Sequence, residues 1–445
     1  MYARLIESRS IKLHLRTQTL LFVAAIVPLC LLGLRTAFAG DATWQLNPPV
    51  GHPFLEGGDW TAASNWTPAT VPNGTADTAT FGVSNVTDLF IENTENPGFA
   101  FEVQVAGIVF NPGASAYTIF VVNFSNGLLI SGGGITNNSG KVQNFAVGED
   151  FSELMFTGHA TAGSQTVFDV SGSLNPFGHL DFRENSSADH ATFDVRGELF
   201  FNNNSTADHG TFTSIGSPTN SSNFGIISFS DNSTAANGNF TVQGGGNNGS
   251  DPEAGPGFGG RLEFGSGASA GNGTLIANGG TDGGTGGTIF FFDHSNGGTA
   301  RAQVFGNGNL DISPHNAPGV TIGSVEGSGN VFLGANNLTV GSNNLSTTFS
   351  GVIQDGGQNG GVGGSLNKIG SGTLDLTGAN TYTGNTNING GVLKVDGSIT
   401  SNTFVNQHGT LSGAGTINGS VTNNYGGTVS PGDASGSTLT VNSYR

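Results

Sequence analysis

Two Asp-His pairs recur in similar segments of the sequence and have the side chains best suited to bind a metal ion. They are Asp189-His190 and Asp208-His209. Two imidazoles and two carboxylates on neighbouring repeats could hold Zn²⁺ or Ca²⁺. Later copies carry Asn237 or Asn272 where the histidine stands, which indicates that the position needs a turn-forming residue rather than a ligand. We therefore predict no metal site and no cofactor. The alternative is a metal site with Asp189, His190, Asp208 and His209 as its ligands.

Two further strings imitate catalytic or nucleotide-binding motifs. Residues 267–271 read GASAG, the G-x-S-x-G pattern of a hydrolase nucleophile elbow, which requires a strand, a sharp turn and a helix. The string falls in a repeated small-residue turn, so a chance match is the better interpretation. Residues 255–260 imitate a dinucleotide fingerprint, but the pattern of the following residues predicts no helix.

The densest charged group of the sequence consists of Asp181, Arg183 and Glu184. A polysaccharide lyase needs a basic residue that removes a proton, beside carboxylates or a calcium ion. The other arginines of this region, Arg196, Arg261 and Arg301, each lie in a separate repeat or loop. We therefore predict no catalytic residues. A secreted β-helical polysaccharide lyase or hydrolase is the alternative function, because one fold can host many activities.

These residues belong to a series of degenerate repeats. Each repeat begins with an aliphatic-x-Phe strand, passes through a small-residue turn and, in the better copies, returns with a second alternating strand. A spacing of about 19 to 35 residues fits one coil of a solenoid with variable loops. Equivalent residues should then stack in ladders, one containing Phe156, Phe182, Phe201, Phe229, Phe264 and Phe291, and another containing Phe168, Phe193, Phe212 and Phe240.

The composition of the 445-residue chain agrees with a β-rich fold. It contains 75 Gly and 32 Phe, and only 10% of its residues are charged. The many phenylalanines and a hydrophobic fraction of 35% argue against disorder. No long segment after residue 40 has the spacing of apolar residues expected for a helix. We predict an all-β, elongated parallel β-helix. Residues 40–110 would form a capping region, 111–319 a Phe-rich solenoid and 320–445 a solenoid with a different repeat.

The predicted capping region contains all three tryptophans of the chain, Trp44, Trp60 and Trp66. Their position beside proline-rich turns favours a cap that closes one end of the fold. The alternative is an exposed aromatic platform that stacks on sugar rings.

The first 39 residues have the features of a secretory signal peptide. Four basic residues precede an apolar run at 20–34, and Ala-Phe-Ala at 37–39 predicts cleavage between Ala39 and Gly40. An uncleaved membrane anchor is the alternative. The only cysteine, Cys30, lies in this segment, so the mature chain would contain no disulfide. A net charge of −18 makes nucleic acid an unsuitable partner.

Residues 366–395, LNKIGSGTLDLTGANTYTGNTNINGGVLKV, resemble the passenger-associated β-strand repeat of autotransporter proteins, and we assign this repeat to residues 366–398. The resemblance extends into the segment that follows and into the Trp-containing start. It implies a right-handed parallel β-helix that is carried outside the cell, often with a C-terminal β-barrel as anchor. The residues after 397 contain few aromatics and no uninterrupted alternation, so we expect the translocator barrel to be encoded downstream or separately.

The resemblance also implies a function. We expect an exported, adhesin-like passenger without enzymatic activity, which acts in adhesion, matrix or scaffold roles. Its partners would be surface glycans or host and matrix proteins. It would lie at the cell surface, outside the outer membrane or in the medium, and would stay periplasmic without a translocator.

Overall fold

The computed structural model describes residues 40–445 except 52–55, 92–100, 102, 122–126, 149–151, 172–177, 220–222, 247–254 and 433–436. The predicted signal peptide, with Ala39 at its expected cleavage site, lies outside the described residues. Within the described ranges the only helix is a single 3₁₀ turn, η1 (Ala63–Asn65). No helix in this part of the chain has the length and apolar character needed to cross a membrane.

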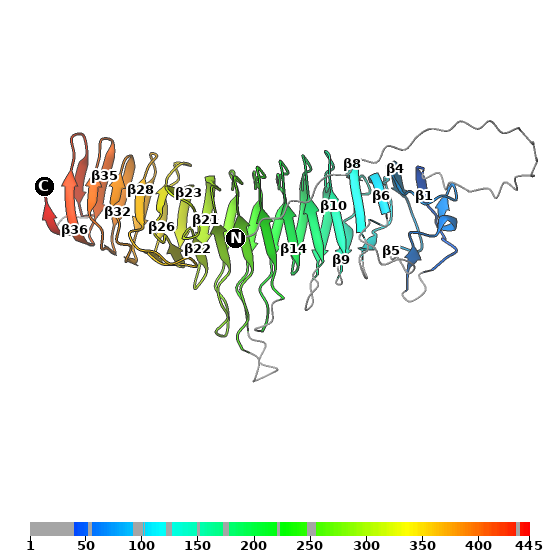
Figure 1. Cartoon of the computed structure of the whole chain (residues 1–445), viewed down its shortest axis with the longest axis horizontal. Coiled ribbons are helices and arrows are strands. Elements are labelled where there is room, and N and C mark those ends of the chain that lie inside the picture. The colour runs from blue at the N-terminus through cyan, green and yellow to red at the C-terminus, as the bar shows by residue number, and fades with distance from the viewer. Residues whose placement is uncertain are drawn as a thin grey trace, which may run out of the picture. The chain divides into compact units, whose positions relative to one another are not determined.

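Residues Ala39–Arg445 form one compact unit. From residue 74 to residue 340 the chain alternates between two sheets, so that each circuit adds one strand to each (Figure 1). Neighbouring strands are parallel, and the exception is β3, which pairs antiparallel with β1. The first sheet contains β1 (Ala42–Trp44), β3 (Trp66–Thr67), β4 (Gly74–Phe81), β6 (Val103–Phe110), β8 (Gly127–Asn137), β10 (Glu153–Phe156), β12 (His179–Phe182), β14 (Glu198–Phe201), β16 (Ile226–Phe229), β18 (Arg261–Phe264), β20 (Thr288–Phe291), β22 (Asn309–Asp311), β24 (Asn330–Phe332) and β27 (Val352–Gln354).

The opposite side of the stack has a second series of strands. It contains β2 (Gly58–Asp59), β5 (Asp88–Ile91), β7 (Thr118–Val121), β9 (Gln143–Val147), β11 (Ser164–Val170), β13 (His190–Val195), β15 (Thr211–Ser214), β17 (Asn239–Val242), β19 (Thr274–Ala277), β21 (Gly297–Val304), β23 (Gly319–Gly327), β25 (Asn337–Val340) and β26 (Thr347–Phe349). The parallel β-solenoid predicted from the repeats is therefore confirmed.

In the C-terminal part the circuits contribute three short strands each as far as β33, and every strand from β28 to β33 pairs with the third one after it, for example β28 with β31. Beyond them β34 pairs with β36, β35 with β37 and β36 with β38. The strands are β28 (Ser365–Lys368), β29 (Thr373–Leu376), β30 (Ala379–Asn380), β31 (Thr386–Ile388), β32 (Gly391–Val395), β33 (Ser398–Ile399), β34 (Thr403–Val405), β35 (Gly409–Gly413), β36 (Thr416–Asn423), β37 (Thr428–Pro431) and β38 (Thr440–Tyr444).

The core consists largely of two phenylalanine ladders, as the repeats predict. Successive rings of the ladder from Phe156 to Phe291 stack with centroids 4.5–5.1 Å apart. In the second ladder, which Phe145 extends by one ring, the separations are 4.6–4.9 Å. These separations are close to the spacing of strands in a sheet, so in-register parallel pairing brings identical side chains into contact. The two ladders meet edge to face inside each coil, for example at Phe182 and Phe193.

The three tryptophans are buried together in the first coils. Trp44 is 2% exposed, and Trp60 and Trp66 are fully buried. Trp66 packs edge-on against both other indoles at centroid distances of 5.1 and 5.0 Å. A platform for sugars requires an exposed ring face. The alternative prediction of a sugar-binding tryptophan platform is therefore wrong.

The glycine-rich stretch at 366–395 is held by its neighbours above and below. Leu374 stacks in register on Leu393, and both side chains are buried. At Gly378 a Cβ atom would lie 1.9 Å from the carbonyl oxygen of Gly351, so only glycine allows the coils to approach this closely. Small residues here are a condition for close stacking.

Candidate functional site: the polar corner of the solenoid

Four successive coils turn between the two sheets through the same short corner. We call residues 184–190, 203–209, 231–237 and 266–272 the corner segments. Each segment contains two residues with a positive φ angle, five positions apart, such as Asn203 (59°) and Asp208 (50°). Asn and Asp tolerate this left-handed conformation better than other non-glycine residues. The repeated turn residues in the sequence therefore mark a fixed backbone shape.

Small side chains fill the inside of each corner. In the second segment Ser205 and Ala207 point inward and are fully buried, while Thr206 between them forms parallel bridges to Ser187 and Thr234. Larger side chains would force the corner away from the core. The Ser-Thr-Ala sequence of the repeat therefore serves packing.

Hydroxyl and amide groups satisfy the backbone at the two left-handed positions. The Thr206 hydroxyl accepts a hydrogen bond from the amide of Asp208 at 3.0 Å, and Ser187 does the same for Asp189. The amide of Glu184 instead donates to Asn203 Oδ1 of the next coil at 3.1 Å. Each corner is thus stabilised both by itself and by its neighbour.

The two Asp-His pairs lie next to each other on this corner. His190 Nδ1 is 2.6 Å from Asp189 Oδ1, and His209 Nδ1 is 2.6 Å from Asp208 Oδ1. The two imidazole rings are parallel, with centroids 4.9 Å apart. In the next coil Asn237 lies in the same column, with its Nδ2 atom 3.4 Å from His209 Nε2. The equivalence of His209 and Asn237 inferred from the repeats is therefore seen directly.

The ring geometry does not suit a shared metal ion. Because the rings are stacked in the same orientation, their outer nitrogens are separated by about the centroid distance of 4.9 Å. Two nitrogens that bind one Zn²⁺ ion at about 2.1 Å can be at most about 4.2 Å apart. Among the described residues, no group of three or more His, Cys, Asp or Glu side chains converges.

The two motif-like glycine strings lie in strand connections. Ser269 Oγ donates to Asn296 Oδ1 at 2.9 Å and accepts from the amide of Gly271, and the next element is the strand β19. Residues 255–260 lead into the strand β18. Neither string is followed by the helix that its motif requires.

A charged cluster lies on the outer face of the first sheet, close to the corner. Arg183 Nη2 is 2.5 Å from Asp181 Oδ2 and 3.9 Å from Glu153 Oε1. Burial, and then the neighbouring Asp181 charge, raise the pKa of Glu153 to about 7, although Arg183 opposes the shift. Glu184 points elsewhere and accepts a hydrogen bond from the amide of Gly158. Of the three charged residues grouped from the sequence, Asp181 and Arg183 are therefore in contact and Glu184 is not. The second carboxylate near Arg183 belongs to Glu153.

Sequence reasoning missed Glu153 because it belongs to the preceding coil. The signal was present in the register, since Glu153 pairs with His179 and Met155 pairs with Asp181. A carboxyl group with a pKa near 7 can donate a proton at neutral pH, as a general acid does. This is the feature of the structure that favours the alternative, enzymatic function.

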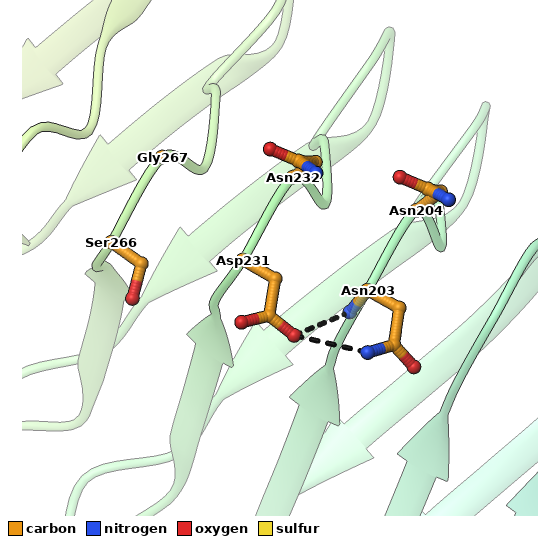
Figure 2. Close-up of a pocket in the computed structure, with 6 residues that line it drawn as sticks. All are labelled: Asn203, Asn204, Asp231, Asn232, Ser266 and Gly267. Carbon is orange, nitrogen blue, oxygen red and sulfur yellow. Dashed lines mark hydrogen bonds between the residues drawn. The ribbon is translucent and has the colours of Figure 1, made fainter.

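An open groove crosses the outer edge of the corner segments. Figure 2 shows its lining, which consists of Asn203, Asn204, Asp231, Asn232, Ser266 and Gly267. It forms because the side chains at Ser266 and Gly267 are smaller than those at the equivalent positions of the two preceding coils, Asn203-Asn204 and Asp231-Asn232. No apolar side chain belongs to this lining.

Comparison with known families agrees with the architecture. Residues 366–395 match the passenger-associated-transport-repeat family. The chain thus contains one passenger-associated-transport repeat, at the residues where its sequence predicts it.

Its relatives include an extracellular serine protease and an adhesin autotransporter. It is 48% identical over 73 residues to an extracellular serine protease of Serratia marcescens, across 16% of this chain and 7% of the relative. It is 40% identical over 103 residues to the adhesin BmaC autotransporter of Brucella suis biovar 1 (strain 1330), across 22% of this chain and 3% of the relative. The chain therefore spans only a small part of the length of these relatives.

One solved structure also resembles the chain, the TibC-catalyzed hyper-glycosylated TibA55-350 fragment. The two are 12% identical, with a TM-score of 0.27 over 81% of this chain and 97% of the fragment. The assignment as a parallel β-solenoid depends on the strand pairing described above.

Proposed function

We propose that the chain is exported and acts outside the cell as a non-enzymatic passenger in adhesion or in a surface matrix. The observation that carries this proposal is the passenger-associated repeat at 366–395, which is built into the same stack as the rest of the solenoid. A parallel stack presents the same polar side chains at regular intervals over many coils, and such a surface suits extended polymers. Surface glycans and matrix proteins are the partners we propose.

Display on a Gram-negative cell tests this function. The chain is expressed with its own N-terminal segment, once fused to an intact autotransporter barrel and once alone. We expect a mature N-terminus at Gly40 in both cases, with cleavage by external protease only in the fusion. Cells that display the fusion should also adhere to polysaccharide-coated surfaces better than cells with the barrel alone. Equal adhesion would contradict the proposal.

The second candidate function is a polysaccharide lyase or hydrolase, favoured by Glu153 and its raised pKa. Purified protein incubated with acidic and neutral polysaccharides would then release new reducing or unsaturated ends. Glu153→Gln should abolish such activity, whereas Glu198→Gln, in the same column of the sheet two coils away, should retain it. Because we propose a non-enzymatic function, we expect the parent protein and both variants to release no such ends.

A further inference from the structure

The side chains that cap the corner segments form a ladder with one break. Along three coils, the amide of each first left-handed residue donates to a side chain of the next coil. The pairs are Gly158 with Glu184 Oε2 at 2.8 Å, Glu184 with Asn203 Oδ1 at 3.1 Å, and Asn203 with Asp231 Oδ2 at 3.0 Å. At the next step Ser266 takes the capping position, and within the described part of the chain the amide of Asp231 has no hydrogen-bond acceptor. The ladder resumes after it, since the amide of Ser266 donates to Asp293 Oδ2.

A row of asparagines ends at the same coil. Asn185, Asn204 and Asn232 occupy equivalent exposed positions, and Gly267 follows them in the row. A Cβ atom on Gly267 would lie 3.0 Å from the carbonyl oxygen of Asp231, so the backbone approaches closely here. Ser266 and Gly267 thus stand where the preceding coils have longer side chains, and the space beside Asp231 stays open.

The lining of this groove has a distinct chemical character. Each asparagine amide offers donors and an acceptor, Ser266 offers a hydroxyl, and the Asp231 backbone adds a donor. In Figure 2 the Asn204 and Asn232 side chains project outward from the turn, while Asp231 bonds to Asn203. The groove is open to solvent along its length, and its open volume is about 630 Å³. Such a surface complements a ligand rich in hydroxyl groups.

The negative charge of the chain and of the groove makes anionic ligands unsuitable. The chain has a net charge of −18, and the Asp231 carboxylate lies in the groove itself. Both features repel anionic polymers. A calcium ion needs six to eight oxygen ligands, usually with several carboxylates, and the groove supplies only one carboxylate.

We propose that this groove is a binding site for a neutral saccharide, in which the Asp231 amide and the Asn204 and Asn232 side chains bond to sugar oxygens. The proposal rests on the proposed function, because a chain outside the cell is exposed to glycans. Coils repeat at about 4.8 Å, so Asn204 and Asn232 lie on successive coils at a spacing that lets both bond to one saccharide in the groove.

Calorimetric titration of purified residues 40–445 tests the site, with cellohexaose, maltohexaose and chitohexaose as neutral probes and hexagalacturonate as the anionic probe. At least one neutral probe should bind, and hexagalacturonate should not. Ser266→Asp restores the missing cap on the Asp231 amide, as Asp293 caps Ser266, and should weaken binding at least tenfold without lowering Tm. Asn232→Ala should weaken binding about five- to tenfold. Asn185→Ala, in the same row but outside the groove, is the matched control and should bind like the parent protein.

Three results would overturn the proposal. They are no binding of any neutral probe, unchanged binding by Ser266→Asp, and Ca²⁺ binding that Asp231→Asn removes while no saccharide binds. The display experiment separates this outcome from a failure of the proposed function. A protein that is displayed and adheres, but binds no neutral probe in the groove, leaves the function intact and removes only this site.

Discussion

At the scale of single residues, Phe201 should contribute strongly to stability. Its ring stacks on Phe182 at 4.8 Å and on Phe229 at 4.5 Å, and it is fully buried. Phe201→Ala leaves a cavity between two coils and should lower the free energy of unfolding by about 3–5 kcal/mol. Chemical denaturation measures the change. Phe200→Ala, on the outer face of the same strand, is the control and should cost much less, so equal losses would disprove the ladder argument.

His209 should contribute little, because Asn237 occupies the same column in the next coil. His209→Asn keeps a side chain that is suited to the turn. We expect a change of at most about 0.5 kcal/mol in the free energy of unfolding and no change in Zn²⁺ or Ca²⁺ binding. Denaturation and metal titration check both points. Loss of tight metal binding in this variant would show that the Asp-His pairs form a metal site.

Lys368 makes stability depend on pH. Its side chain is 1% exposed, and Nζ donates to the carbonyl oxygens of Ile369 and Gly390 at 2.7 and 3.3 Å. Burial lowers its pKa from 10.5 to about 8. The unfolded chain therefore binds more protons between these values, so stability should rise from pH 8 to pH 10.5 and stay constant below pH 8 with respect to this group.

Lys368→Met tests this pH dependence. A depression of this size corresponds to about 3 kcal/mol, which the variant should no longer gain between pH 8 and 10.5. Between pH 8 and 10.5 the unfolding free energy of the parent protein should rise relative to that of the variant. From pH 6 to 8 the difference between the two proteins should stay constant. Parallel curves throughout would show that the lysine has its ordinary pKa in the folded protein.

At the scale of elements, the strands were easier to predict than the corners. Alternating Phe and aliphatic residues mark strands such as β14 and β15, because one face is buried throughout the stack. The turn residues show that a corner exists. They do not show that Asn203 caps the amide of one coil while Asp231 caps the next, because these contacts join residues 19 and 28 positions apart. Tertiary stacking decides these details.

Thr206 is expected to stabilise its corner through the hydrogen bond to the amide of Asp208. Thr206→Val keeps the shape and removes this acceptor. The free energy of unfolding should fall by about 1 kcal/mol, the usual net value of such a bond. Thr213→Val, on the outer face of β15, is the matched control, and an equal effect at both sites in denaturation would exclude a specific role for the corner hydroxyl.

At the scale of the whole molecule, local sequence predicts the stacking but not what becomes buried at its end or open on its surface. The tryptophan residues allowed both an exposed platform and a buried cluster, and packing of Trp44 and Trp60 against Trp66 selects the cluster. The groove at Ser266 was also unforeseen. Its cause is the difference between one coil and its neighbours, and that difference has meaning only once the register is known.

The register of the stack makes whole coils removable. Deletion of residues 198–225 removes β14 and β15 together, and joins Gly197 to Ile226. β16 can then pair with β12, which places Phe229 on Phe182, and β17 can pair with β13, which places Phe240 on Phe193. Stability in such a stack is roughly a sum of contributions from coils and their interfaces. We expect the variant to fold with the same β-type circular dichroism and a cooperative thermal transition. Deletion of residues 198–211, half a coil, brings unlike strands together and should prevent folding of this region. If both deletions fail to fold, the coils are not interchangeable units.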